Sequence, residues 1–261
     1  MTDSLSKNEV SHNTLTVSQD RWFEAQQWEF QGWQKADSPC TWRQRIRSIF
    51  YYLLEKVYDQ TEPKHWTEDW NGWWAERFNH YSFLPLQMEN SLELGSGPYT
   101  NTRLVLNKIQ INHVYCSDPL AKGYIHFDRG WLAWAHRKGK IWVDDHPAEE
   151  TPFASNYFDL VIMINVLDHV RDALACLREA IRVTRPDGYF LLGQDLTGVE
   201  DYQREIPLDD IGHPIRIDHF TLDELLLPQF EIVMHKVLPR EQGRNPACHY
   251  GTYIFVGKRL T

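Results

Sequence analysis

The stretch "SLELGSGPYTNTR", residues 91–103, constrains the fold most, because it joins a short apolar run to a glycine turn and then to polar residues that can start a helix. Glycines at 95 and 97 allow the backbone to approach a ligand closely, as in open α/β sheets. A dinucleotide fingerprint requires a further glycine three positions later, and residue 100 is a threonine. The stretch therefore predicts a strand–turn–helix unit whose ligand needs only the first two glycines.

Apolar runs alternate with helical stripes after this turn, which is typical of an α/β chain. The run "FDLVIMIN" at 158–165 is almost entirely apolar, as in a central strand covered on both faces. Parallel neighbours need a crossover of about a dozen residues or more, and only a short link joins the last two runs, so the last strand should run antiparallel. We expect an α/β, Rossmann-like, seven-stranded and mostly parallel sheet with an antiparallel last strand, plus an N-terminal helical extension. The expected strands lie at residues 91–95, 113–118, 140–145, 158–165, 189–196, 230–238 and 250–260.

Tryptophans concentrate before this sheet, since eight of the eleven precede residue 90. Trp22, Ala25, Glu29 and Trp33 recur at helical spacing, so this part of the chain should be helical. The aromatic side chains either attach this region to the sheet or line a substrate pocket, and the region could also form a homodimer. The predicted parts are a disordered tail at 1–17, a Trp-rich helical extension at 18–88, and a domain at 89–261 with a lid insert at about 196–220.

Composition narrows the classes of partner. The formal net charge of -9 at pH 7 argues against a nucleic-acid ligand, because nucleic-acid binders usually carry a basic stripe. No run of about 18 apolar residues predicts a membrane span, and the polar N-terminus lacks the pattern of a signal peptide, so we expect no membrane partner and a cytoplasmic protein. The four cysteines form no CxxC pair and the histidines form no HExxH, so we expect no metal site. A small molecule is the partner class that remains.

Acidic and polar residues stand at the carboxyl ends of the expected strands, where open α/β sheets bind ligands. Asp118 ends the second strand, Glu149 follows the third and Asn165 ends the fourth. A carboxylate about 20 residues beyond the glycine turn can accept hydrogen bonds from ribose hydroxyls, and Asp118 has this spacing. The ligand is therefore expected to contain a ribose. Structural alternatives remain, since Asp118 and Asn165 could cap helices and Glu149 could lie in a solvated loop.

Four segments, in this order, resemble the class I S-adenosylmethionine-dependent methyltransferases, in particular the type 11 group that includes quinone-methylating enzymes. They are "ELGSGP" from Glu93, "CSDP" around Asp118, "AEETPFASNYFDLVIMINVLDHV" at 148–170 and "RPDGYFLLG" at 185–193. The resemblance implies S-adenosylmethionine as cofactor and direct in-line transfer of its methyl group. It also assigns Glu93, Gly95, Ser96 and Gly97 to the methionine end, Asp118 to the ribose, Ala148 and Glu149 to the adenine side and Asn165 to the inner wall.

Two histidines are candidates for a general base, because the unperturbed pKa of histidine lies near neutrality. His169 follows the fourth strand, His213 stands between a glycine and a proline, and either could instead be structural. We expect O-methylation of a sugar-containing or natural-product intermediate. The alternatives are N- or C-methylation, a nicotinamide-dependent oxidoreductase and a non-catalytic scaffold that binds S-adenosylmethionine. Contacts with the acceptor are expected from Asp195, His219, Arg240, Arg244, His249 and Tyr250, and the two arginines could bind a carboxylate or phosphate.

Overall fold

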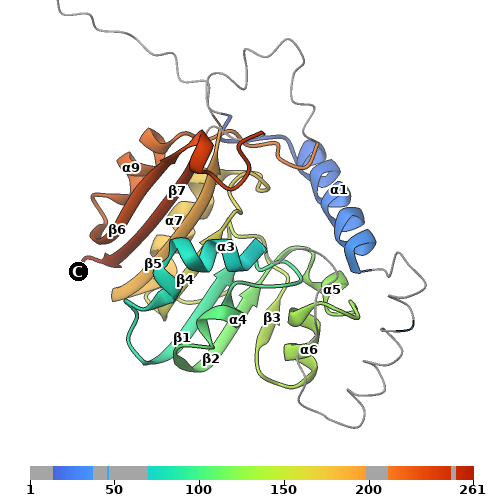
Figure 1. The fold of residues 1–261 in the computed structure, drawn as a ribbon, viewed down its shortest axis with the longest axis horizontal. Coiled ribbons are helices and arrows are strands. Elements are labelled where there is room, and N and C mark those ends of the chain that lie inside the picture. The colour runs from blue at the N-terminus through green and yellow to red at the C-terminus, as the bar shows by residue number, and fades with distance from the viewer. Residues whose placement is uncertain (1–13, 38–45, 47–69, 198–210, 248–250) are drawn as a thin grey trace, which may run out of the picture.

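The computed structural model describes residues 14–37, 46, 70–197, 211–247 and 251–261 (Figure 1). Within these ranges the chain forms a seven-stranded sheet with the order β3-β2-β1-β4-β5-β7-β6. The last strand in the chain runs antiparallel to both of its neighbours, and the other pairs are parallel. The predicted fold class is confirmed. The strands are β1 (Gln87–Leu94), β2 (Gln110–Ser117), β3 (Trp142–Asp144), β4 (Phe158–Ile164), β5 (Thr184–Leu196), β6 (Phe230–Pro239) and β7 (Gly251–Arg259).

Helices cover both faces of this sheet, and α1 lies apart from these layers (Figure 1). The helices are α1 (Gln19–Asp37), α3 (Trp70–Arg77), α4 (Thr102–Val105), α5 (Ala121–Tyr124), α6 (Trp131–Arg137), α7 (Ala173–Val183) and α9 (His219–Leu226), with short 3₁₀ turns η1 (Asn79–Tyr81) and η2 (Arg240–Gln242). No helix of the described ranges is long and apolar enough to cross a membrane.

The apolar run of β4 explains its central place, because its side chains alternate between two hydrophobic cores. Leu160 and Ile162 belong to a core that contains residues of α3, whereas Val161 and Met163 belong to a core that contains residues of α7. Every residue of β4 is buried. The strand is therefore fixed rigidly, and the residues that follow it are held at its carboxyl end.

The order of the strands creates one change of direction, between β1 and β4. The chain runs outward from β1 through β2 to β3 and then returns to place β4 on the other side of β1. Ligands of open α/β sheets bind in the crevice that such a reversal leaves at the carboxyl ends of the strands. The loops after β1, β2 and β4 meet at this crevice.

Helix α1 packs across these loops. The Trp22 indole N–H donates to the carbonyl oxygen of His169 after β4, at 3.1 Å. The Trp33 ring contacts the Tyr99 ring after β1, with 5.4 Å between centroids. The Asp37 carboxylate accepts the backbone N–H of Arg129, which lies beyond β2, at 2.8 Å. The Trp-rich extension thus covers the crevice with its first helix.

The start of the chain is ordered earlier than predicted. Thr14 and Thr16 form antiparallel bridges with Arg216 and Asp172, so the predicted disordered tail at 1–17 is wrong for residues 14–17. Backbone hydrogen bonds join this segment to Arg216 and to Arg171, so its backbone polar groups are paired within the domain. The other predicted boundaries, and the homodimer through the extension, stay predictions.

Candidate functional site

The glycine turn after β1 uses backbone conformations that favour glycine. Gly95 and Gly97 have φ values of +65° and +56°. A Cβ atom at Gly95 would lie 2.5 Å from a Val166 methyl group, whereas one at Gly97 would meet nothing within 4 Å. Gly95 is therefore needed for close packing, and Gly97 leaves open space at the surface of the turn.

Glu93 lies behind this turn. Its carboxylate accepts the backbone N–H of Asn101 at 2.8 Å and that of Thr102 at 2.9 Å. The side chain is buried, and burial raises the pKa of this carboxyl above its ordinary value. Glu93 lines neither cavity described below, so it holds the turn from behind.

Thr100 occupies the position where a dinucleotide fingerprint has its last glycine. It adopts the left-handed region, with φ +41°, and the Asn71 amide donates to its carbonyl oxygen at 2.6 Å. A β-branched residue in this region carries strain of about 1–3 kcal/mol, which the surrounding contacts must offset. The turn therefore keeps the shape of a glycine turn without the third glycine.

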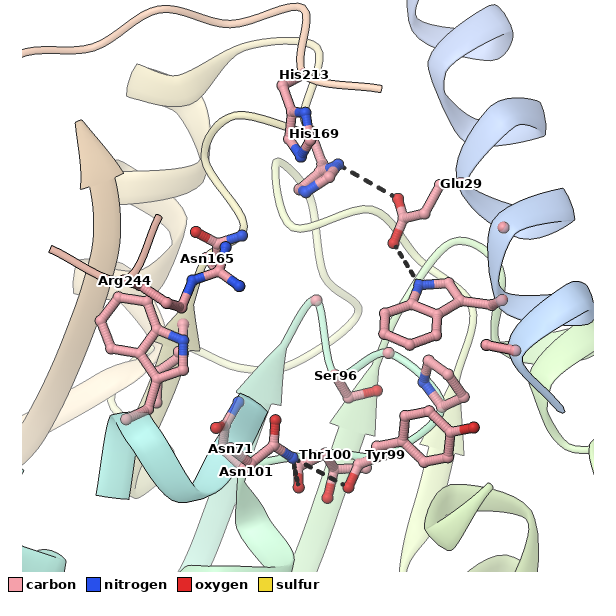
Figure 2. A pocket seen from close by; sticks show the side chains of 18 of the residues that line it. Glu29, Asn71, Ser96, Tyr99, Thr100, Asn101, Asn165, His169, His213 and Arg244 are labelled. Atoms are coloured by element: carbon pink, nitrogen blue, oxygen red, sulfur yellow. Dashed lines mark hydrogen bonds and ion pairs between the residues drawn. The ribbon is translucent and has the colours of Figure 1, made fainter. Parts of the chain in front are cut away.

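A cavity of about 520 Å³ opens beside the turn (Figure 2). Three polar atoms of its lining, Ser96 Oγ, Thr100 Oγ1 and Asn101 Oδ1, are buried and have no hydrogen-bond partner within the described ranges. Buried polar groups are normally paired, so these atoms point to a polar ligand at the turn. The lining comprises Trp28, Glu29, Gly32, Trp33, Ala36, Asn71, Trp74, Gly95, Ser96, Gly97, Pro98, Tyr99, Thr100, Asn101, Ile164, Asn165, His169, His213, Arg244 and Asn245.

A second, smaller cavity of about 50 Å³ lies next to the first, and the two share Glu29, Gly95, Asn165 and His169. Its lining adds Trp22, Gln26, Asp118, Pro119, Ala148, Glu149, Val166 and Val170. The structure thus brings together the predicted residues from the ends of β1, β2 and β4 and from the loop after β3. A ligand with two unlike ends would extend from one cavity into the other.

Asp118 lies at the base of the smaller cavity. One carboxylate oxygen accepts the backbone N–H of Gly97 and the other that of Leu120, each at 2.9 Å. Burial, and next the negative charge of Glu29 on α1, raise the pKa of Asp118 to about 7. Each oxygen retains a lone pair for a further donor, such as a ribose hydroxyl.

The two residues predicted to border the adenine, Ala148 and Glu149, make different contacts. Ala148 is buried in the wall of the smaller cavity. One Glu149 oxygen accepts the backbone N–H groups of Arg171 and Asp172, at 2.7 and 3.1 Å. Glu149 therefore both borders the cavity and fixes the loop after β4.

Asn165, Asp195 and Arg244 form one network at the far wall. The Asp195 carboxylate is fully buried and binds the Arg244 guanidinium through one oxygen, at 2.9 Å from Nε and 2.6 Å from Nη2. In the orientation that satisfies both groups, the Asn165 amide donates to Asp195 at 3.0 Å and accepts from Arg244 at 3.2 Å. Asn165 adopts φ +57° to do so. The charge of Arg244 is thus largely balanced by Asp195, which weakens the prediction that this arginine binds an acceptor anion.

The two predicted histidine bases lie side by side at the rim of the cavity, with ring centroids 4.4 Å apart. Figure 2 shows Glu29 facing them from α1, and its Oε2 lies 3.5 Å from His169 Nδ1. The Trp33 indole N–H donates to the other Glu29 oxygen at 3.2 Å. Asp168 lies on the other side, 3.9 Å from His169 Nε2 and 4.0 Å from His213 Nε2.

Two predicted acceptor residues lie elsewhere. His219 starts α9, where its ring contacts that of Phe220, and Arg240 lies in η2. Neither lines the cavities, so a contact of these two residues with an acceptor finds no support in the described ranges. His249 and Tyr250 lie outside those ranges, as does most of the predicted lid at about 196–220.

Sequence reasoning did not assign Glu29 or Asp168 to the site, nor lining residues such as Asn71 and Asn101. Glu29 was recognised only as part of a helical stripe, and Asp168 was not singled out. Glu29 stands more than 60 residues before Gly95 in the chain, and helical spacing gives no sign of which loop the helix crosses. The signal that could have been used is its acidic character within a stripe of otherwise apolar residues.

The comparisons agree with this geometry. Residues 92–192 match the family model of a methyltransferase domain. No curated protein matches the chain. Among solved structures, 1,6-didemethyltoxoflavin-N1-methyltransferase from Burkholderia thailandensis, with bound 1,6-didemethyltoxoflavin and S-adenosylhomocysteine, is 16% identical with a TM-score of 0.53, over 86% of this chain and 93% of that one.

Two further structures show how widely the fold is used. Phosphoethanolamine N-methyltransferase 2 from Haemonchus contortus, in complex with phosphomonomethylethanolamine and S-adenosylhomocysteine, is 14% identical with a TM-score of 0.54, over 84% of this chain and 59% of that one. The cyclase SpnF is 17% identical with a TM-score of 0.50, over 83% of this chain and 94% of that one. At these identities the likeness is one of fold. The strand order and the glycine turn agree with that fold, and residues 92–192 within it match the model of a methyltransferase domain.

Proposed function

We propose that this chain transfers the methyl group of S-adenosylmethionine to a hydroxyl oxygen of a small, ring-bearing acceptor, such as a sugar-containing or natural-product intermediate. The observation that carries the proposal is the large cavity, which joins the glycine turn to an aromatic wall and a pair of histidines. N- or C-methylation is the alternative for the acceptor atom. A scaffold that binds the cofactor without catalysis is the alternative for the class.

The two adjoining cavities are where the cofactor would lie. We assign the methionine end to the turn, where Gly97 leaves space and the Ser96 hydroxyl awaits a partner. Asp118 would accept hydrogen bonds from the ribose hydroxyls, and Ala148 and Glu149 would border the adenine in the smaller cavity. Glu93 acts indirectly, by fixing the turn.

The acceptor would occupy the rest of the large cavity. Trp28, Trp33, Trp74 and Tyr99 supply aromatic faces on which a ring can pack. Bound S-adenosylmethionine supplies a methyl group on a positively charged sulfur, which makes that carbon electrophilic. The protein must then hold the acceptor oxygen about 3–3.5 Å from this carbon, in line with the departing sulfur, and exclude water. The cover formed by α1 suits the last requirement.

His169 and His213 are favoured as catalytic residues because an acceptor hydroxyl must lose its proton when the methyl group is transferred. Both side chains line the large cavity, and a neutral imidazole nitrogen can accept a hydrogen bond from a hydroxyl and take up its proton. Glu29 would hold His169 in one orientation through Nδ1. Amines that are neutral at working pH need no such base, so a requirement for the histidines would separate O-methylation from N-methylation.

Two measurements test the proposal. Calorimetric titration with S-adenosylhomocysteine should show binding, and NADH should show none. A screen of hydroxylated ring compounds with methyl-labelled cofactor should then find transfer, and His169→Gln should lower kcat about a hundredfold or more. His113→Gln is the matched control, because His113 is half exposed beside Glu89 and lies outside both cavities. Cofactor binding without transfer to any acceptor would favour the scaffold, and label found only on amines would favour N-methylation.

A further inference from the structure

We propose that Asp168, His169 and His213 bind a divalent transition-metal cation at the rim of the acceptor cavity. One carboxylate oxygen and one nitrogen from each imidazole lie within 4.8 Å of one another. Asp168 is buried, and both histidine side chains are about four-fifths buried and line the cavity. Two imidazoles and a carboxylate are a common ligand set for catalytic metals, and they leave further coordination positions open.

The distances are close to those of a loaded site. The carboxylate oxygens of Asp168 lie 3.9 Å from His169 Nε2 and 4.0 Å from His213 Nε2. Ligand atoms at about 2.0–2.2 Å from one cation lie about 3–3.5 Å apart. Asp168 therefore needs to approach each ring by about 1 Å or less, which small rotations of the two rings can provide.

Glu29 is the second observation that points to a metal. A histidine that binds a metal through one ring nitrogen almost always donates the other N–H to a carboxylate, carbonyl or water. His169 Nδ1, on the side of the ring away from Asp168, faces Glu29 Oε2 at 3.5 Å, and the Trp33 indole N–H holds the other Glu29 oxygen (Figure 2). The arrangement from Trp33 through Glu29 to His169 is the outer support that such a site requires.

A second group of similar composition lacks these features. Asp144, Asp145 and His146 also lie close together, but at the exposed edge beyond β3. Lys122 pairs with Asp145 at 2.5 Å, and the Ser117 hydroxyl donates to Asp144 at 3.0 Å. These carboxylates are satisfied by protein groups, and the group serves as an internal control.

The ligand types favour a particular class of cation. Imidazole nitrogens suit Fe²⁺, Ni²⁺ and Zn²⁺, and the carboxylate also suits Mn²⁺, whereas Mg²⁺ and Ca²⁺ prefer sites made of oxygen ligands. The role of this cation rests on the proposed hydroxyl acceptor. In the metal-loaded site His169 and His213 are ligands, and the cation replaces the histidine base described above. Bound to the acceptor oxygen, the cation lowers the pKa of that hydroxyl so that its proton leaves to solvent. The oxygen then forms a bond to the methyl carbon as the carbon–sulfur bond breaks and neutral S-adenosylhomocysteine departs.

The test measures binding of Mn²⁺ alone to the full chain after treatment with a chelator, through loss of the free Mn²⁺ signal in electron paramagnetic resonance. We expect one site per chain, and equal amounts of Mg²⁺ or Ca²⁺ should not displace the ion. His213→Gln and Asp168→Asn should weaken binding tenfold or more, and Glu29→Gln about tenfold, as for removal of an outer support. His146→Gln should leave Mn²⁺ affinity unchanged. Affinity for S-adenosylhomocysteine, measured in parallel, should persist in His213→Gln and so show that this variant is folded.

Three results would overturn the inference: no stoichiometric Mn²⁺ binding to the wild-type chain, full binding by His213→Gln, or loss of binding in His146→Gln. The metal result is obtained without acceptor, so it can be separated from a failure of the proposed function. If Mn²⁺ binds as expected but no labelled methyl group is transferred to any hydroxyl, the metal site is supported and the proposed hydroxyl acceptor is refuted.

Discussion

Binding of S-adenosylhomocysteine should strengthen about tenfold between pH 6 and pH 8. Asp118 has a pKa of about 7, raised by burial and then by the charge of Glu29. With that pKa the ionised fraction is about 0.1 at pH 6 and about 0.9 at pH 8. Ribose hydroxyls donate to a carboxylate more strongly than to a neutral carboxyl group, so affinity should follow the ionised fraction.

Calorimetric titration of the wild-type chain and two variants at several pH values measures this effect. Asp118→Asn cannot ionise, so its weaker affinity should not change over the interval. Glu29→Gln removes the nearby charge, so the rise should move to lower pH. An equal rise in Asp118→Asn would assign the pH dependence to another group and refute the ribose assignment.

The raised pKa of Asp118 should also make the stability of the chain without ligand depend on pH. The pKa of Asp118 in the folded chain, about 7, lies above its ordinary value of 3.8, so folding favours the protonated form. Its contribution to stability is complete below 3.8 and is lost as pH rises toward 7. Between pH 5 and pH 7 the wild-type chain should lose about 2 kcal/mol relative to Asp118→Asn in urea unfolding. A constant difference between the two would mean that Asp118 is ionised throughout, and would remove the basis of the binding prediction as well.

Two other predictions test the turn and the far wall. Gly95→Ala should destabilise the folded chain, because its Cβ would meet Val166 at 2.5 Å. Gly97→Ala, with open space around the same atom in the chain without ligand, should lower the free energy of unfolding only by the backbone strain of about 1–2 kcal/mol, and equal losses in urea unfolding would contradict the packing argument. Arg244→Gln should lower the free energy of unfolding by about 3–5 kcal/mol, because it leaves the buried Asp195 carboxylate without its ion pair, and a loss below 1 kcal/mol in urea unfolding would show that other groups support that charge.

The fold was predictable because its signals are local. The apolar run of β4 and the glycine turn at Gly95 each determine a neighbourhood of a few residues, and their order along the chain limits the sheet topology. Asp118 was predictable for a related reason, since the carboxyl ends of neighbouring parallel strands meet at one edge.

The histidine cluster shows what local signals cannot supply. Metal-binding patterns are recognised by fixed spacings, and His213 stands 44 residues after His169. Their approach depends on the segment before α9 returning to the end of β4, where the Ile215 N–H bonds the Asp168 carbonyl oxygen. Arg240 shows the converse: it is close to Arg244 in the chain, but it lies in η2 and does not line the cavity that Arg244 lines.

Helix α1 connects the cofactor side and the acceptor side of the site through Glu29, so the two sides should influence each other. Glu29 raises the pKa of Asp118 on the cofactor side and contacts His169 on the acceptor side. A cation or proton on His169 would offset the charge of Glu29, and would thereby lower the pKa of Asp118 and favour the ionised form that binds ribose. By reciprocity, bound cofactor would favour the charged state of the histidine cluster. Glu29 would thus couple cofactor binding to readiness for the acceptor, through its charge at Asp118 and its contact with His169.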